Sequence, residues 1–255
     1  MTVLTRRIVT RKSEREIAAM RVAGRIVAEV LARLEAEVRP GAVTGDLDRM
    51  AEEMIRAAGA EPSFKGYRGY PASICVSIDE EVVHGIPGQR RIREGDLVSV
   101  DAGAIWGGYH GDGARTFVVG NVPRRVRELV DTTRRALEAG IAAAQPGQRI
   151  GNISAAIEDA ALAGGFGVVR QYVGHGIGQE MHEEPQVHNF RGPARGIALA
   201  PGLCLAIEPM LTLGAAEVVL RADGWTVATR DRSLAAHFED TIAITDHGPE
   251  VLTRR

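Results

Sequence analysis

Apolar residues recur at helical spacing in four stretches of the chain, and each stretch ends at a glycine or at a proline–glycine pair. The first stretch follows Ser13, a good N-cap residue, and Glu16 lies three positions later as in a capping box. The pattern therefore predicts helices over 13–38, 44–57 and 123–144, and a fourth helix that runs to Gly164–Gly165.

Short apolar runs bounded by turn residues predict the strands. They are ICVSI (74–78), DLVSVDAGAI and YHGDGARTFVVG as a hairpin around a glycine-rich turn at 106–108, VVRQYV (168–173), LCLAIEPM (203–210), a hairpin about Asp223–Gly224, and EDTIAI (239–244). The segment GHGIGQEMHEEP (174–185) is expected to be a loop.

The order of helices and strands recurs along the chain. Residues 39–60 lie over residues 145–166 with a constant offset of 106, and Pro40/Pro146 and Gly41/Gly147 are among the coinciding pairs. The repeat predicts pseudo-twofold symmetry, a functional site where the halves join, and one domain instead of two. We expect a short N-terminal segment (1–12) and a single domain (13–255), with halves of about 13–122 and 123–255.

Composition excludes several classes of protein. The chain is 45% hydrophobic and carries a formal net charge of −2, which is unlike a disordered chain or a nucleic-acid binder. No apolar run approaches the roughly 20 residues of a membrane span, and the N-terminus lacks the apolar core of a signal peptide. The two cysteines fit neither a disulfide framework nor a metal-binding pair, so we expect a reducing, cytoplasmic setting.

Four acidic residues lie in or beside apolar strands: Asp101, Asp112, Glu208 and Glu239. A tight hairpin would place Asp101 opposite Asp112; alternatively the register is slipped, or each carboxylate pairs with an arginine such as Arg115. No lysine or arginine occurs within two residues of Asp101, Glu208 or Glu239. Converging buried carboxylates need cations, so metal is the favoured hypothesis.

Histidines complete the candidate site. His175 and His182 lie in one glycine-rich loop, and His84 occupies the corresponding place in the first half. Oxygen ligands with one imidazole suit Mn, Fe or Co better than a thiolate-type zinc site, and four carboxylates favour two metals. His110 and His237, each two residues before a candidate ligand, would lie beside it on the same strand face.

Five motifs, in this order and spacing, resemble those of type I methionine aminopeptidases. They are SIDEEVVHGIPG, VSVDAGAIWGGYHGDGARTF, YVGHGIGQEMHEEPQV, LAIEPML and HFEDTIAIT. The resemblance covers about residues 13–252 and implies the pita-bread fold, an α+β domain with internal pseudo-symmetry that agrees with the repeat. It also implies removal of the initiator methionine from nascent chains whose second residue is small.

The resemblance implies a role for each matching residue. Asp101 would chelate one of two divalent ions (Co, Mn or Fe, with zinc as an alternative), Asp112 and Glu239 would bridge both ions, and His175 and Glu208 would bind the other. Glu208 would also act as general base. His84 would contact the scissile amide nitrogen, and His182 would stabilise the oxyanion.

The same resemblance implies an apolar pocket for the methionine side chain. Its lining would comprise Phe64, Tyr67, Tyr70, Cys75, Met181 and Trp225, together with His84 and His182. Two positions depart from the family pattern: Met181 stands where phenylalanine is frequent, and Phe64 where a smaller residue is frequent. Both remain apolar, so we expect an altered pocket shape with the same substrate.

Two alternative functions remain open at this point. An Xaa-Pro aminopeptidase shares the fold and the five ligands but usually carries an additional N-terminal domain. A non-catalytic binding protein on this fold would be expected to have lost ligands. The expected partners are nascent N-termini and, transiently, the ribosome, without a membrane or sequence-specific nucleic acid, and a monomer is the family default.

Overall fold

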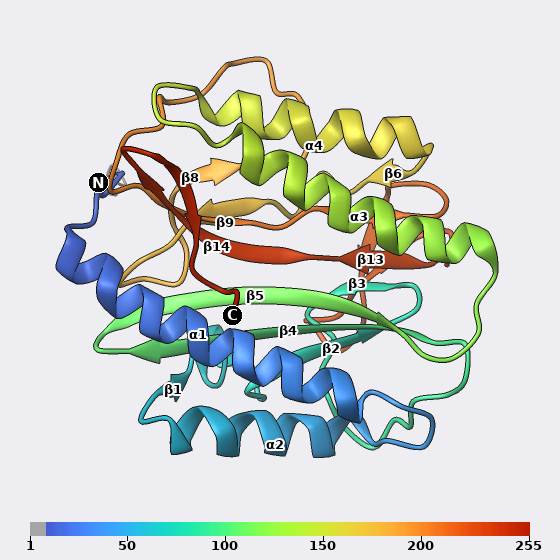
Figure 1. The fold of residues 1–255 in the computed structure, drawn as a ribbon. Coiled ribbons are helices and arrows are strands. Elements are labelled where there is room, and N and C mark those ends of the chain that lie inside the picture. The colour runs from blue at the N-terminus through green and yellow to red at the C-terminus, as the bar shows by residue number, and fades with distance from the viewer. Residues whose placement is uncertain (1–8) are drawn as a thin grey trace, which may run out of the picture.

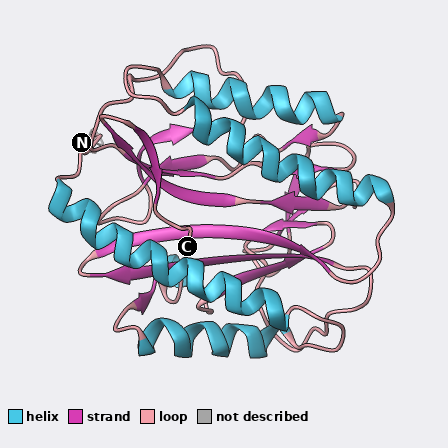
Figure 2. Cartoon of the chain, in the orientation of Figure 1, coloured by secondary structure: helices cyan, strands magenta, loops and turns pink. Residues whose placement is uncertain are grey.

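The computed structural model describes residues 9–255, and the text below concerns those residues (Figure 1). A curved, mainly antiparallel sheet carries helices over one of its faces (Figure 2). The helices are α1 (Glu14–Glu37), α2 (Thr44–Ala57), α3 (Arg124–Ala143) and α4 (Ile150–Gly164), so all four predicted helices are confirmed. Over the described range, none of them has the length and apolar character needed to cross a bilayer.

The large sheet has nine strands, seven of them in the spatial order β1-β4-β5-β14-β9-β7-β8. Strand β2 also pairs with β4, and β15 with β14. The bounds are β1 (Glu61–Pro62), β2 (Ile74–Ile78), β4 (Leu97–Trp106), β5 (Tyr109–Val118), β7 (Gly174–Gly176), β8 (Glu183–Val187), β9 (Cys204–Ile207), β14 (Glu239–Thr245) and β15 (Gly248–Val251).

Two small sheets lie beside the large one. The first has the order β13-β10-β6 and the second β11-β12-β3. Their bounds are β3 (Glu81–Val83), β6 (Gly167–Val168), β10 (Met210–Thr212), β11 (Val218–Leu220), β12 (Val227–Thr229) and β13 (Ala235–His237).

The internal repeat is visible in the backbone. Helices α2 and α4 begin at Thr44 and Ile150, which reproduces the offset counted in the sequence. Gly41 and Gly147 both have positive φ, 87° and 85°, which glycine adopts without steric cost. Their N–H groups donate to Ile92 O and Leu199 O, each at 2.8 Å. Equivalent turns therefore enter equivalent helices, and the join between the two halves lies between β5 and β14.

Each half buries its own apolar core between helices and sheet. In the first half Leu34, Ile55 and Val100 are buried in one cluster, and in the second half Leu137, Ile157 and Leu205 are buried in another. Burying each such side chain contributes about 1.5–3 kcal/mol. Both clusters lie on the helical side of the sheet, so the opposite face is free to carry polar side chains.

Three predictions about strands are wrong in detail. Residues 168–173 do not form one strand, because β6 ends at Val168 and β7 begins at Gly174. The run 203–210 is divided between β9 and β10, which belong to different sheets, by Glu208 and by Pro209, which has no N–H to donate. The predicted loop 174–185 contains β7 and the start of β8.

Candidate metal centre

Five adjacent strands of the large sheet each position one of the five predicted ligands. In spatial order, Asp101 lies on β4, Asp112 on β5, Glu239 on β14, Glu208 directly after β9, and His175 on β7. Val98 and Val100 pack into the helical core, and side chains alternate along a strand, so Asp101 points to the face away from the helices. The site thus straddles the join between the two halves.

The expected direct opposition of Asp101 and Asp112 is wrong. The hairpin turn consists of Gly107 and Gly108, both with positive φ (58° and 81°), and Trp106 pairs with Tyr109. A two-residue turn of this kind matches the twist of a hairpin. The turn centre lies one residue beyond the midpoint of the two aspartates, so Asp101 opposes Ala114 and Asp112 opposes Gly103. The carboxylates are diagonal neighbours, which permits convergence without direct opposition.

The donor set fits a divalent cation. Ligand atoms of Asp112, His175 and Glu239 lie within 4.8 Å of one another. Among the described residues, Asp101 Oδ1, Asp112 Oδ1 and Glu239 Oε1 are buried without a hydrogen-bond partner. Buried acceptors in this state are costly, and a bound cation would satisfy them.

His175 is oriented for coordination. Its Nδ1 lies 2.9 Å from the carbonyl of Gly176, which can only accept, so Nδ1 carries the hydrogen of the neutral ring. The Nε2 lone pair is then available to a metal, and it lies 3.5 Å from Glu208 Oε1. A backbone carbonyl that fixes the tautomer is a common partner of metal-binding histidines.

The carboxylates repel one another in the metal-free protein. Burial raises the pKa of Asp112 to about 7. Burial and the neighbouring charge of Asp112 also raise the pKa values of Asp101, Glu208 and Glu239 well above their usual range. Such a cluster holds protons at neutral pH unless cations replace them.

The pKa values of the buried histidines are lowered, in contrast to those of the carboxyl groups. Burial lowers the pKa of His175 to about 4 and that of His182 to about 3, and neighbouring His175 contributes to the shift of His182. Burial similarly lowers the pKa values of His110 to about 4 and of His237 to about 3. The rings are therefore neutral at pH 7 and can act as ligands or hydrogen-bond partners.

These shifts predict how the stability of the metal-free protein depends on pH. A carboxyl with a raised folded pKa destabilises the fold as pH rises from its unfolded pKa of about 4 to the folded value. A histidine with a lowered folded pKa destabilises the fold as pH falls below about 6.5. Above pH 6.5 the carboxyl effect remains alone, so the midpoint of thermal unfolding should fall between pH 6.5 and 8.

The measurement is calorimetric unfolding of the protein with chelator and with excess Mn²⁺. Added metal should remove the decline because it replaces the protons on the carboxylates. A metal-free protein whose stability is constant or increases over this interval would contradict the shifts assigned to the cluster.

His182 lies beside this centre, and His84 contributes, after burial, to the lowered pKa values of His182 and His237. The His182 ring is 4.3 Å from the His175 ring, and its Nδ1 is hydrogen-bonded to the Tyr67 hydroxyl at 2.8 Å. His84 has φ of 60°, an uncommon conformation for a non-glycine residue that is often found at functional sites. Its ring packs edge-on against Tyr172 at 5.6 Å between centroids, and burial lowers its pKa.

The predicted methionine-pocket residues come together in one apolar cluster next to the centre. Phe64, Tyr70, Cys75 and Met181 are buried in it, and Tyr67 and Trp225 pack against them. Tyr70 meets Trp225 edge-on, with ring centroids 5.0 Å apart.

Sequence reasoning missed some neighbours of the predicted residues. Ala72 and Ile86 belong to the apolar cluster, and Tyr172 contacts His84. Ile86 could have been found from its place in the HGIPG motif, whereas Tyr172 carries no distinguishing signal. His110 is hydrogen-bonded to Ser63 at 2.9 Å, and His237 Nε2 lies 4.0 Å from Oε2 of the candidate ligand Glu239.

Known proteins resemble this chain along nearly its whole length. The sequence model of metallopeptidase family M24 matches residues 18–246. A methionine aminopeptidase of Clostridium acetobutylicum is 51% identical over 243 residues, which cover 95% of this chain and 97% of that protein. Methionine aminopeptidase 1 of Bacillus subtilis is 49% identical and is covered to 98%.

Solved structures agree with these matches. A methionine aminopeptidase from Thermotoga maritima superimposes with a TM-score of 0.95 at 44% identity, covering 97% of this chain and 100% of the other. A prolidase from Pyrococcus furiosus superimposes with a TM-score of 0.78 at 23% identity and shows the shared fold alone. The predicted pita-bread fold is confirmed. The chain belongs to metallopeptidase family M24 and, within it, to the methionine aminopeptidases.

Proposed function

We propose that this protein hydrolyses the first peptide bond of newly made chains that begin with methionine and have a small second residue. Membership of family M24 implies divalent metal, and the site described above offers a donor set for it. The observation that carries the proposal is the arrangement of five ligands on five adjacent strands beside an apolar cluster that fits a methionine side chain.

The five ligands would hold two divalent ions. Asp101 would chelate one ion, His175 and Glu208 would bind the other, and Asp112 and Glu239 would bridge the two. Four carboxylates exceed what one divalent ion needs, which supports a pair. Mn, Fe and Co suit this mixture of oxygen and imidazole ligands, with zinc as an alternative. When bound, such ions lower the pKa of a coordinated water and polarise the substrate carbonyl.

Glu208 would move the proton. As general base it would take a proton from the attacking water and later pass that proton to the leaving amine. Its position directly after β9, with Oε1 at 3.5 Å from Nε2 of His175, supports this role beside the proposed metal centre.

The two histidines would bind the scissile amide. With the Tyr67 hydroxyl donating to Nδ1 of His182, the Nε2–H of that ring can donate to the developing oxyanion. His84 is neutral because burial lowers its pKa, so it can accept the N–H of the scissile amide.

The pocket determines the specificity. The aromatic rings of Phe64, Tyr67, Tyr70 and Trp225 would surround the unbranched, polarisable methionine side chain with apolar contacts, and sulfur–aromatic contacts would add about 0.3–1.5 kcal/mol each. Met181 and Phe64 would change the shape of the pocket and keep its apolar character.

Assays with short peptides test this function. We expect Met-Ala-Ser to be cleaved in the presence of Mn²⁺, Fe²⁺ or Co²⁺, with cleavage abolished by chelation, and Met-Leu-Ser to be cleaved far more slowly. Preferential cleavage of Ala-Pro peptides would instead establish an Xaa-Pro aminopeptidase. Metal binding without cleavage of either peptide would establish a non-catalytic binding protein.

The cellular setting follows from the proposed substrate. Nascent N-termini emerge in the cytoplasm, so the protein would act there, with transient ribosome contact. We expect it to be a monomer with a single catalytic domain (residues 13–255). Sedimentation of the protein with and without translating ribosomes tests both the oligomeric state and the contact.

A further inference from the structure

We propose that the C-terminal residues Thr253 and Arg254, through Asp240, are positioning residues that set the geometry of the two bridging ligands. This inference rests on the proposed metal centre and extends it to the opposite face of the sheet. The two halves of the chain meet where strand β5 lies beside strand β14, and we call this boundary the seam.

The seam has few backbone contacts for the position it occupies. Asp112 lies on β5 and Glu239 on β14, yet these two strands pair at two positions, Glu239 with Ala114 and Asp240 with Gly113. The next contact is made by a side chain. The Thr241 hydroxyl accepts from Asp112 N–H at 2.9 Å and donates to Asp112 C=O at 2.8 Å, so it takes the place of a backbone pair.

Several hydrogen bonds beside the seam converge on the side chain of Asp240. It follows Glu239 along β14 and is fully buried, with its carboxylate directed to the helical side of the sheet. Its Oδ1 accepts from Arg115 Nη2 at 2.6 Å and from the Thr253 hydroxyl at 2.8 Å. Its Oδ2 accepts from Nε and Nη2 of Arg254 at 2.9 and 2.6 Å. Both donors of Arg254 converge on the single oxygen Oδ2, and charge-assisted hydrogen bonds of this kind are short and strong.

These partners also act on the backbone of the ligands themselves. Arg115 Nη1 donates to the carbonyls of Ala114 and Glu239 at 2.8 and 2.5 Å. The Thr253 hydroxyl accepts from Thr241 N–H at 3.1 Å. The carbonyl of Glu239, the two residues that follow it, and both backbone groups of Asp112 are therefore tied to one network that includes Thr253 and Arg254.

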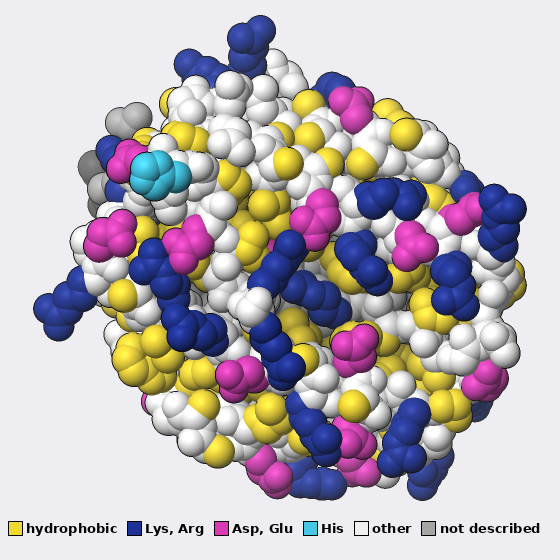
Figure 3. All heavy atoms as spheres, viewed as in Figure 1, with side chains coloured by type: hydrophobic (Ala, Val, Ile, Leu, Met, Phe, Trp, Pro, Cys, Tyr) yellow, Lys and Arg dark blue, Asp and Glu magenta, His cyan; other side chains and the backbone are white. Residues whose placement is uncertain are grey.

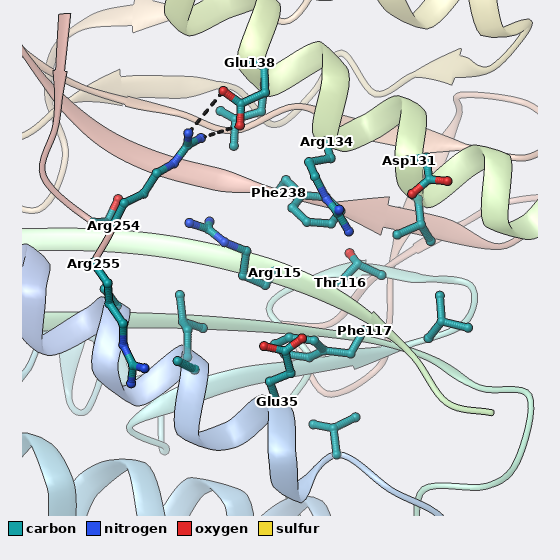
Figure 4. A pocket seen from close by; sticks show the side chains of 18 of the residues that line it. Glu35, Arg115, Thr116, Phe117, Asp131, Arg134, Glu138, Phe238, Arg254 and Arg255 are labelled. Carbon is teal, nitrogen blue, oxygen red and sulfur yellow. Dashed lines mark hydrogen bonds and ion pairs between the residues drawn. The ribbon is translucent and has the colours of Figure 1, made fainter.

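The network is anchored to a helix of the second half. Glu138 on α3 pairs with Arg254 at 2.7 Å, and both residues line a groove of about 700 Å³ between α1 and α3 (Figure 4). Basic side chains gather across this face of the molecule (Figure 3). Arg115 and Arg254 direct their charge inward to Asp240, whereas Arg127, which lines the same groove, has no ion pair among the described residues.

The network would hold the two bridging ligands at a fixed separation. Bridging requires Asp112 and Glu239, which come from different halves, to keep a fixed separation while both are charged and repel each other. Within the sheet, two backbone pairs and the Thr241 hydroxyl hold β5 and β14 together against this repulsion. On the helical face of the sheet, the hydrogen bonds of Asp240 to Arg115 and Arg254 add to this support. Groups that contact the metal ligands, as Arg115 and Thr241 do, typically change metal affinity by 10–100-fold, and Arg254 acts on this support through Asp240.

The test is the metal affinity of Arg254→Met in the full-length protein. We expect Mn²⁺ or Co²⁺, titrated into the metal-free variant at a temperature well below unfolding, to bind about tenfold or more weakly than to the unaltered protein. The visible absorption of bound Co²⁺ should change as well, because the ligand geometry changes. Arg127→Met is the matched control and should leave both readouts unaltered.

A second variant separates positioning from folding. Arg254→Met leaves Asp240 with fewer partners, so the double variant Asp240→Asn/Arg254→Met should regain thermal stability while metal affinity stays low. Recovery of affinity together with stability would overturn the inference, as would unaltered affinity in Arg254→Met. If the unaltered protein itself binds neither metal, the proposed function fails first.

Discussion

Replacing Asp112 with asparagine is expected to abolish both metal uptake and peptide cleavage. The carboxylate lies on β5 at the seam, its Oδ1 has no partner among the described residues, and its ligand atoms lie within 4.8 Å of those of His175 and Glu239. An amide keeps the shape but loses the charge that a shared cation requires. Because catalysis by bound metal contributes several kcal/mol, the rate should fall by about a thousandfold or more.

The same substitution has an opposite effect on the metal-free fold. Burial raises the pKa of Asp112 to about 7, which shows that ionising this group in the folded protein is unfavourable. Asparagine removes that charge from the cluster. The metal-free variant should therefore be at least as stable as the unaltered protein, and its stability should decline less between pH 6.5 and 8.

Calorimetry, metal titration and peptide cleavage measure these effects on one preparation. Asp246→Asn is a suitable control because Asp246 is exposed in the turn between β14 and β15. Full activity in Asp112→Asn would refute the bridging role. Loss of activity with normal metal uptake would place Asp112 outside the metal centre.

Replacing His84 with alanine is expected to lower turnover while leaving metal affinity unaltered. The ring is near enough to His182 and His237 to influence their pKa values, it is not among the proposed ligands, and burial lowers its own pKa so that it is neutral at pH 7. A hydrogen-bond partner for the reacting amide contributes typically 10²–10⁴-fold, so kcat should fall by about a hundredfold or more.

The measurement pairs steady-state kinetics with a metal titration. The KM for Met-Ala-Ser should change little, because the apolar cluster that would hold the methionine side chain is retained. His247→Ala, at an exposed turn position, is the control. A near-normal kcat would eliminate the catalytic role, and a loss of metal affinity would make His84 a structural support of the centre instead.

Local sequence signals were sufficient for the helices and for the chemical nature of the site. Ser13 and Glu16 form the predicted capping box, and apolar periodicity located α2 at its observed bounds. Acidic residues next to apolar strands without nearby basic residues predicted a metal site, and the orphaned oxygens of Asp101, Asp112 and Glu239 fit that prediction. These features depend on neighbours along the chain, so sequence carries them.

Pairing between distant segments was the part that sequence left open. The turn at Gly107–Gly108 shifted the register of Asp101 and Asp112, and Pro209 divided a predicted strand between two sheets. Both outcomes depend on which strand each segment pairs with. The apolar pattern of a segment predicts a strand but does not specify its partner strand or its sheet.

The sequence by itself determined the repeat, the helices, the ligand types and the resemblance that led to the family. Tertiary structure decided that β5 and β14 lie side by side, that six scattered apolar residues form one cluster, and that Arg254 reaches Asp240. The physical reason is that ligand convergence and charge pairing depend on through-space distances. Glu239 and Asp112 are 127 positions apart in the chain, and only the folded sheet brings their oxygens within reach of one ion.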